Sequence, residues 1–143
     1  MAWNLSQKTF TAPAGVDLSQ NQFTFVSLSS AGDASYCGKT TIPRGILINQ
    51  PSVGTFAGNS QYQPTICYDG VTRLAVGDAY PIGTYFVPGS LDGTYGYGFA
   101  VADASSTQSC IRAWSTQAST AAYDIVTVQM IGPYPGNDTT TNP

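Results

Sequence analysis

The sequence contains no histidine and no glutamate, and only 9% of its 143 residues are charged. Histidine is the commonest general base near neutral pH and the commonest metal ligand, so its absence removes every Ser-His and Cys-His nucleophilic pair. The five basic residues are too few to form the clustered basic surface that binds duplex DNA, RNA or an anionic membrane. We therefore expect no nucleic-acid partner and no membrane partner.

Long apolar runs are also absent. No stretch of about 18 or more apolar residues occurs, and the first eight residues lack the charged head and apolar run of a signal peptide. We expect synthesis in the cytoplasm. Cys37, Cys67 and Cys110 are odd in number and far apart, which implies neither a full disulfide framework nor a zinc site. Buried free thiols are expected, the alternative being one disulfide and one leftover thiol.

What the chain does contain favours strands. Hydrophobic residues make up 42% of the sequence and aromatic residues 12%, which is enough apolar surface to offset the entropy lost on folding. Helix-forming Glu, Lys and Leu are scarce, whereas Thr, Ser, Gly, Tyr and Val are abundant. The composition predicts one compact all-β domain of antiparallel strands, and the pattern leaves a β-barrel and a β-sandwich both open.

Alternating apolar and β-branched residues place the expected strands. They lie at 8–11, 22–28, 46–49, 65–68, 71–74, 83–87, 94–102, 109–115 and 124–131. Asp69-Gly70 and Asp92-Gly93 each read as a tight turn between two such strands. Residues 52–61 are mostly small and polar and are expected to form a surface loop.

The segment 94–102 alternates most strictly. One side of this expected strand is bulky, with Tyr95, Tyr97, Phe99 and Val101, and the other is nearly bare, with Gly96, Gly98, Ala100 and Ala102. A bare face lets another backbone approach closely. We expect that neighbour to be a second sheet of the same subunit, although a neighbouring subunit is the alternative.

The organisation along the chain is expected to have three parts. Residues 1–21, with Pro13 and Gly15 after the first strand, read as an extended N-terminal arm. Residues 22–132 form the β domain, and residues 133–143 form a Pro- and Thr-rich tail.

No catalytic pattern stands out. The glycines at 93, 96 and 98 lie within a strand and fail as a dinucleotide turn, and no nucleophile elbow, phosphate loop or calcium loop is present. Asp69 and Asp92 are explained by their turns. We therefore predict no enzyme, no catalytic residue, no cofactor and no metal, while a pair of aspartates meeting in space as in a glycosidase stays open.

A second hypothesis is a carbohydrate-binding β-sandwich module, in which exposed tyrosines and tryptophans stack on sugar rings.

Three blocks in order resemble a known family. They are DLSQNQFTFVSL at 17–28, PRGILINQP at 43–51 and DGVTRLAVGDA at 69–79, and the chain continues to DIVTV at 124–128. Together they resemble the capsid decoration (cement) proteins of tailed bacteriophages, in particular the small family often found beside the major capsid gene. The resemblance extends from the arm to about Met130.

The resemblance implies a compact β-barrel or tulip-like domain that forms a homotrimer on the outer surface of the virion head. Its implied partner is the major capsid protein of the same phage, and it would be made in the host cytoplasm. Candidates for contact with the capsid or for the trimer interface are Trp3, Leu5, Phe10, Tyr95, Tyr97 and Trp114. The arm either adds a strand to the shell protein or packs on its own trimer.

Overall fold

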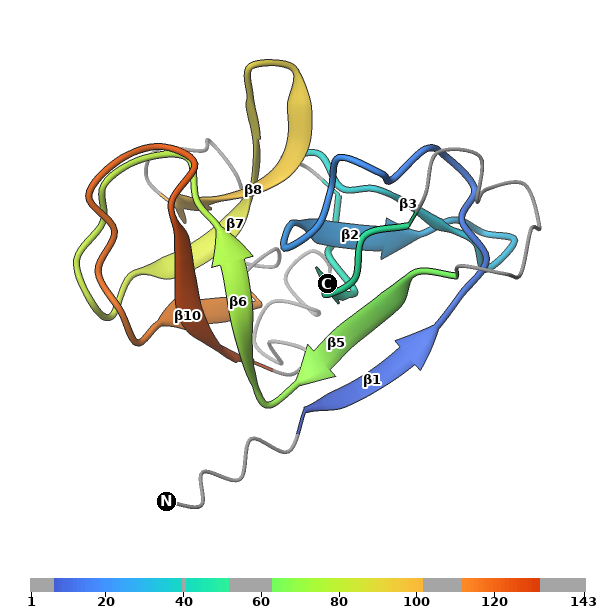
Figure 1. Cartoon of the computed structure of the whole chain (residues 1–143), viewed down its shortest axis with the longest axis horizontal. Coiled ribbons are helices and arrows are strands. Elements are labelled where there is room, and N and C mark those ends of the chain that lie inside the picture. Colours follow the sequence, from blue (N-terminus) through green and yellow to red (C-terminus); the bar gives the residue numbers. More distant parts are fainter. Residues whose placement is uncertain (1–6, 40, 52–62, 102–111, 132–143) are drawn as a thin grey trace, which may run out of the picture.

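The computed structural model describes residues 7–39, 41–51, 63–101 and 112–131. These residues form two five-stranded antiparallel sheets with almost no helix, so the expected all-β class is confirmed. Sheet A has the order β1-β5-β4-β2-β3, and sheet B has the order β6-β10-β9-β7-β8. The sheets do not close into a barrel, and they pack as a sandwich with sheet B on the left and sheet A on the right in Figure 1.

The ten strands are short and follow the chain in order. Their bounds are β1 Lys8–Thr11, β2 Phe25–Leu28, β3 Ala34–Tyr36, β4 Gly45–Leu47, β5 Thr65–Asp69, β6 Val71–Ala75, β7 Tyr85–Leu91, β8 Thr94–Ala100, β9 Ala113–Ser115 and β10 Ile125–Met130. The sequence predicted all of them except β3, within a few residues at most ends. The predicted loop at 52–61 and the tail at 133–143 lie outside the described residues.

The main core lies between the two sheets. Sheet A contributes Phe25, Ile46 and Cys67, and sheet B contributes Leu74 and Phe86 among others, all without exposed surface. Burying a side chain of this size stabilises the fold by about 1.5–3 kcal/mol relative to leaving it in water. This contact between apolar faces holds the sandwich together.

Sheet A is also covered on its outer face. Val26, Leu47 and Ile66 are each adjacent to an inward residue of their strand and are completely buried, because Ala12, Ala14 and Leu18 pack over them. Strands buried on both faces carry apolar residues in succession rather than in alternation, which explains the pairs Phe25-Val26, Ile46-Leu47 and Ile66-Cys67.

The described part of the expected arm therefore belongs to the sandwich. Strand β1 pairs with β5, with Phe10 opposite Ile66, and the backbone of Ala34 donates a hydrogen bond of 2.7 Å to Pro13. Residues 7–21, the described part of the expected arm, form an edge strand and a cover of sheet A. Residues 1–6 lie outside the described part.

The Asp69-Gly70 turn differs from the expectation. It joins β5 and β6 as predicted, but these strands do not pair with each other: β5 lies between β1 and β4, whereas β6 pairs with β10. The turn is a corner at which the chain passes from sheet A to sheet B, and Asp69 Oδ1 accepts a hydrogen bond of 2.8 Å from the backbone N–H of Gly70. A tight turn of this composition serves a corner as well as a hairpin.

The Asp92-Gly93 turn is a true hairpin. It joins β7 to β8 with Leu91 opposite Thr94, and both turn residues have positive φ, 50° and 84°, as a type I′ turn requires. The hairpin tip projects above the sandwich in Figure 1.

The bare face of β8 points into the sandwich, as expected. A Cβ placed on Gly96 would lie 2.4 Å from the carbonyl oxygen of Phe25, and one on Gly98 would lie 2.5 Å from Leu74 Cδ2. At Gly96 the close neighbour is therefore the second sheet of the same subunit, as expected, whereas Leu74 beside Gly98 belongs to β6 of the same sheet as β8.

Cys67 is a buried free thiol, and burial raises its pKa above the ordinary value. Cys37 is buried as well, with its Sγ atom 3.3 Å from the carbonyl oxygen of Thr41. Cys110 lies outside the described residues.

Candidate binding sites

The structure distributes the predicted site residues over three places. Phe10 lies in β1 on the outer face of sheet A, and Trp114 lies half-buried in β9, opposite Tyr85 of β7 and Gln129 of β10. Tyr95 and Tyr97 lie in β8 at the edge of sheet B. Trp3 and Leu5 lie outside the described residues. The predicted set is therefore not one surface, although two of its members line pockets.

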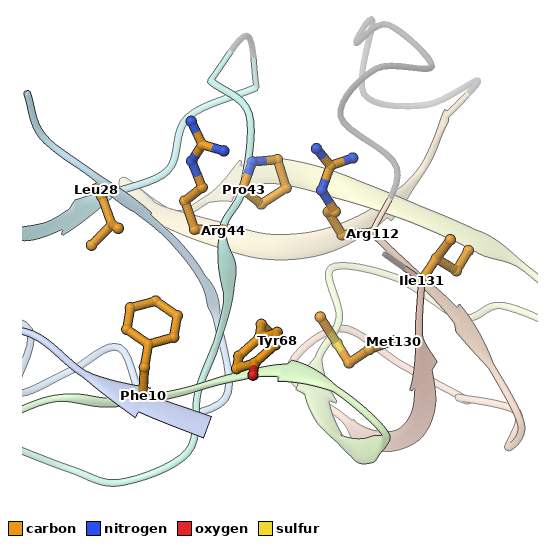
Figure 2. A pocket seen from close by; sticks show the side chains of 8 residues that line it. All are labelled: Phe10, Leu28, Pro43, Arg44, Tyr68, Arg112, Met130 and Ile131. Atoms are coloured by element: carbon orange, nitrogen blue, oxygen red, sulfur yellow. The ribbon is translucent and has the colours of Figure 1, made fainter. Parts of the chain in front are cut away.

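The first pocket, which we call the arginine pocket, has a volume of about 310 Å³. It lies where one end of sheet A meets the end of β10, and it is mostly apolar. Its lining residues are Phe10, Leu28, Pro43, Arg44, Tyr68, Arg112, Met130 and Ile131, shown in Figure 2.

The aromatic side of the arginine pocket is built by the pairing of β1 with β5. Phe10 stands opposite Ile66, so it shares the outer face of sheet A with Tyr68, two residues further along β5. The two rings lie 5.9 Å apart, centroid to centroid, at an angle of 50°. Tyr68 is exposed, and the two rings together offer an apolar surface to a partner of this protein.

The arginines give the same pocket a positive charge. In Figure 2 the side chains of Arg44 and Arg112 extend in the same direction on either side of Pro43, away from the two rings. Arg112 is buried, whereas Arg44 is exposed. The Arg44 guanidinium makes no ion pair or hydrogen bond with the described part of the chain. No carboxylate of the residues that the structure describes lines the pocket, so it fits an apolar group that also carries a negative charge.

The second pocket, which we call the tyrosine pocket, has a volume of about 280 Å³. It lies where the edge strands β3 and β8 of the two sheets meet. Its lining residues are Asp17, Gln20, Asn21, Tyr36, Gly93, Thr94 and Tyr95. The rings of Tyr36 and Tyr95 lie 6.0 Å apart at an angle of 44°.

Hydrogen bonds fix the walls of the tyrosine pocket. Tyr36 Oη donates a hydrogen bond of 2.8 Å to the backbone oxygen of Asp17, and Asn21 Nδ2 donates one of 3.1 Å to the backbone oxygen of Tyr95. Hydrogen bonds from Ser19 to the Asp17 carboxylate lower the pKa of Asp17, so this group is ionised at neutral pH. The pocket thus joins an aromatic surface to a carboxylate that accepts hydrogen bonds.

Tyr97 lies two residues after Tyr95 in β8, outside the tyrosine pocket, and contacts Tyr123. The two rings lie 5.6 Å apart at 89°, and Tyr123 Oη donates a hydrogen bond to the Asp92 carboxylate. That hydrogen bond is the main cause of the raised pKa of Tyr123, whereas burial is the main cause of the raised pKa of Tyr97. Tyr97 is therefore half-buried within its own subunit.

The described residues contain no group of three His, Cys, Asp or Glu side chains that could hold a metal ion. Most of their carboxylates accept local hydrogen bonds in turns, as Asp69 does from Gly70, Asp78 from Ala79 and Asp124 from Thr120. Within the same residues no helix is long and apolar enough to span a membrane. Compared with known proteins, the chain matches no protein-family model, no curated protein and no solved structure.

Sequence reasoning missed the residues that complete both pockets. Arg44 and Tyr68 were not predicted for the arginine pocket, and Tyr36 and Asp17 were not predicted for the tyrosine pocket. Arg44 did carry a signal, because it is one of only five basic residues and lies beside a proline in the block 43–51. No such signal marked Tyr36, because the strand β3, which it ends, has only three residues and shows no pattern.

Proposed function

We propose that this protein is a structural component of a tailed-phage virion, made in the host cytoplasm, that binds the outer surface of the head as a homotrimer. It contacts the major capsid protein and joins neighbouring capsomers without performing a reaction. The observation that carries the proposal is the ordered set of sequence blocks at 17–28, 43–51, 69–79 and 124–128.

The way these blocks pack supports the proposal. The first two contain β2 and β4, which are neighbours in sheet A, and the last two contain β6 and β10, which are neighbours in sheet B. The backbone of Phe23 connects them, because its N–H donates to Leu47 and its carbonyl accepts from Ala75, at 2.6 and 2.8 Å. The segments that resemble one family therefore lie next to one another in this fold and are not scattered over separate turns.

We propose that the protein binds the shell through the arginine pocket. Its two rings offer apolar contact area, and Arg44 offers a charge that the described residues leave without a partner. A shell segment that inserts an apolar side chain next to an Asp or Glu would match both features. The chain has a net charge of -3, so this attraction is local and does not come from the overall charge.

The subunit contacts of the trimer fall on a different face in this proposal. Tyr85 and Trp114 are cross-strand neighbours on the outer face of sheet B, and Tyr85 is half exposed. Aromatic residues of this kind are enriched at protein interfaces. Three subunits that each hold one shell protein make the second and third contacts intramolecular, so contacts that are weak singly add up to a tight clamp.

The test uses purified protein and phage heads assembled without it. We expect light scattering to give three times the 15.0 kDa chain mass, and electron microscopy to show new density on the outside of heads to which the protein is added. Decorated heads should also resist higher temperatures than bare heads. A monomer that leaves the heads undecorated and equally labile contradicts the proposal.

A pair of variants tests the arginine pocket itself. Arg44→Ala removes the charge in the pocket, and we expect it to weaken head binding about tenfold or more per site, as loss of a charge-assisted hydrogen bond does. Arg73→Ala is the matched control, because Arg73 is also exposed but lies on β6, outside this pocket. Equal losses in both variants would assign the effect to overall charge and reject the pocket.

A further inference from the structure

We propose that the tyrosine pocket binds a neutral pyranose sugar, through the rings of Tyr36 and Tyr95 and the polar side chains beside them. This site is distinct from the arginine pocket, shares no lining residue with it, and does not depend on the proposed role in the capsid. Its volume of about 280 Å³ lies just below the range for small-molecule sites, about 300–1,000 Å³, which suits one sugar ring rather than a long chain.

The geometry of the two rings favours a flat apolar ligand face. Their centroids lie 6.0 Å apart, so the rings contact each other and leave no space for a ligand between them. They form one bent surface on which a ligand lies. A pyranose ring presents C–H groups on one face, and these meet the electron-rich face of an aromatic ring favourably.

The polar lining matches hydroxyl groups. The Asp17 carboxylate accepts hydrogen bonds from Ser19, and its two oxygens have lone pairs enough to accept a further one from a ligand. Asn21 is only 3% exposed and uses its Nδ2 group to bond Tyr95 and Thr24, but nothing in the described chain donates to its Oδ1. A buried acceptor without a donor costs free energy, and a ligand hydroxyl would satisfy it.

The charge of the lining selects a neutral ligand. Asp17 is ionised at neutral pH, and no lysine or arginine among the described residues lines the pocket. A carboxylate or sulfate on the sugar would be repelled by Asp17 and would find no cation in return. A cationic ligand would need aromatic faces on several sides of it, and two rings in mutual contact do not provide them.

The site is held rigid before any ligand arrives. Tyr36 is fixed by its hydrogen bond to Asp17, and the backbone of Tyr95 by its hydrogen bond from Asn21. The hairpin that carries Gly93 and Thr94 is held by its pairing with β7, with Leu91 opposite Thr94 and Ser90 opposite Tyr95. A preformed site loses little entropy on binding, which matters for a small ligand with few contacts.

The experiment is a titration of the full chain, followed by NMR, with methyl glycosides of glucose, galactose, mannose and N-acetylglucosamine. We expect at least one of them to shift the signals of Tyr36 and Tyr95 and to bind with a dissociation constant on the order of 1–10 mM, as ligands of this size do. Glucuronic acid, tetramethylammonium and a proline-rich peptide serve as the anionic, cationic and peptide probes. If none of the four neutral glycosides binds, or if one of the other probes binds more tightly, the proposal is wrong.

Variants locate the binding. Tyr95→Ala should weaken binding about tenfold, because one of the two stacking rings is lost. Ile125→Ala is the control, since Ile125 and Tyr95 are both exposed to 47% and Ile125 lies outside both pockets. Asp17→Asn should weaken binding of the same sugar without loss of the fold, as judged by circular dichroism. Unchanged affinity in Tyr95→Ala, or an equal loss in Ile125→Ala, overturns the assignment.

Discussion

Replacement of Gly96 by alanine tests the contact between β8, at the edge of sheet B, and β2 of sheet A. Gly96 has a φ of 96°, which residues with a side chain rarely adopt, and its Cβ would lie 2.4 Å from the carbonyl oxygen of Phe25. That oxygen belongs to β2, which pairs on both sides with β3 and β4 and therefore cannot move away easily. The variant must bear both backbone strain and a clash with a fixed neighbour.

The two costs can be estimated separately. A backbone held in a sparsely populated region costs about 1–3 kcal/mol, and an overpacked core contact costs a further amount of about 1–3 kcal/mol. Their sum, about 2–6 kcal/mol, is a large part of the 5–15 kcal/mol that separates a typical domain from its unfolded state. We therefore expect Gly96→Ala to unfold at much lower urea concentration than the unmodified protein, or not to fold at all.

Gly83→Ala is the control for this measurement. Gly83 has a similar φ of 91°, but nothing lies within 4 Å of the position that its Cβ would take, so the variant bears the strain alone. The difference between the two variants in the free energy of unfolding, about 1–3 kcal/mol, measures the close approach of β2 to β8. Equal destabilisation of both variants would refute the packing described for this edge.

Two further predictions concern ionisable groups. Asp124 accepts hydrogen bonds from Thr120 and Ala121 that lower its pKa, so its stabilising effect is present above the unfolded-state value of about 3.9 and is lost as the pH falls through the lower folded-state value. The melting temperature of Asp124→Asn should therefore lie below that of the unmodified protein at pH 7. The difference between the two melting temperatures should disappear as the pH falls below about 3.9, and a difference that stays constant over this pH range contradicts the prediction. Cys67 is buried with a raised pKa, so we expect a thiol reagent at pH 7 to label its peptide by orders of magnitude more slowly in the folded than in the urea-unfolded protein; equal rates by mass spectrometry would show that the site is open.

The local features of the fold could be predicted from sequence because neighbouring residues determine them. The Asp92-Gly93 hairpin and the bare face of β8 needed only turn chemistry and the period of two. The sequence around Asp69-Gly70 does not distinguish a corner between two sheets from a hairpin. Which of the two forms depends on the pairing of β5 and β6 with β1, β4 and β10, which lie far away in the chain. The strand β3 is too short to show a period.

The cover of sheet A shows what a reading by segments misses. Residues 12–18 contain small residues and a proline and look like an extended arm when taken alone. The signal for their packing lies in other segments. Three strands of sheet A carry apolar residues in succession, so the outer face of this sheet needs a covering layer as well. The pockets were missed for a similar reason, because Phe10 and Arg44 come together only through the long-range pairing of strands in sheet A, and Tyr36 and Tyr95 only when both sheets are in place.

The corner at Gly70 divides the molecule in a way that affects its biogenesis. All five strands of sheet A precede it in the chain, and all five strands of sheet B follow it. The ribosome thus delivers one whole sheet before the first strand of the other, and the nascent chain presents Phe25, Ile46 and Cys67 to the surrounding solution until the second half is synthesised. During that interval the half-made protein is a natural client for chaperones, and slow translation beyond residue 70 would lengthen its exposure to aggregation.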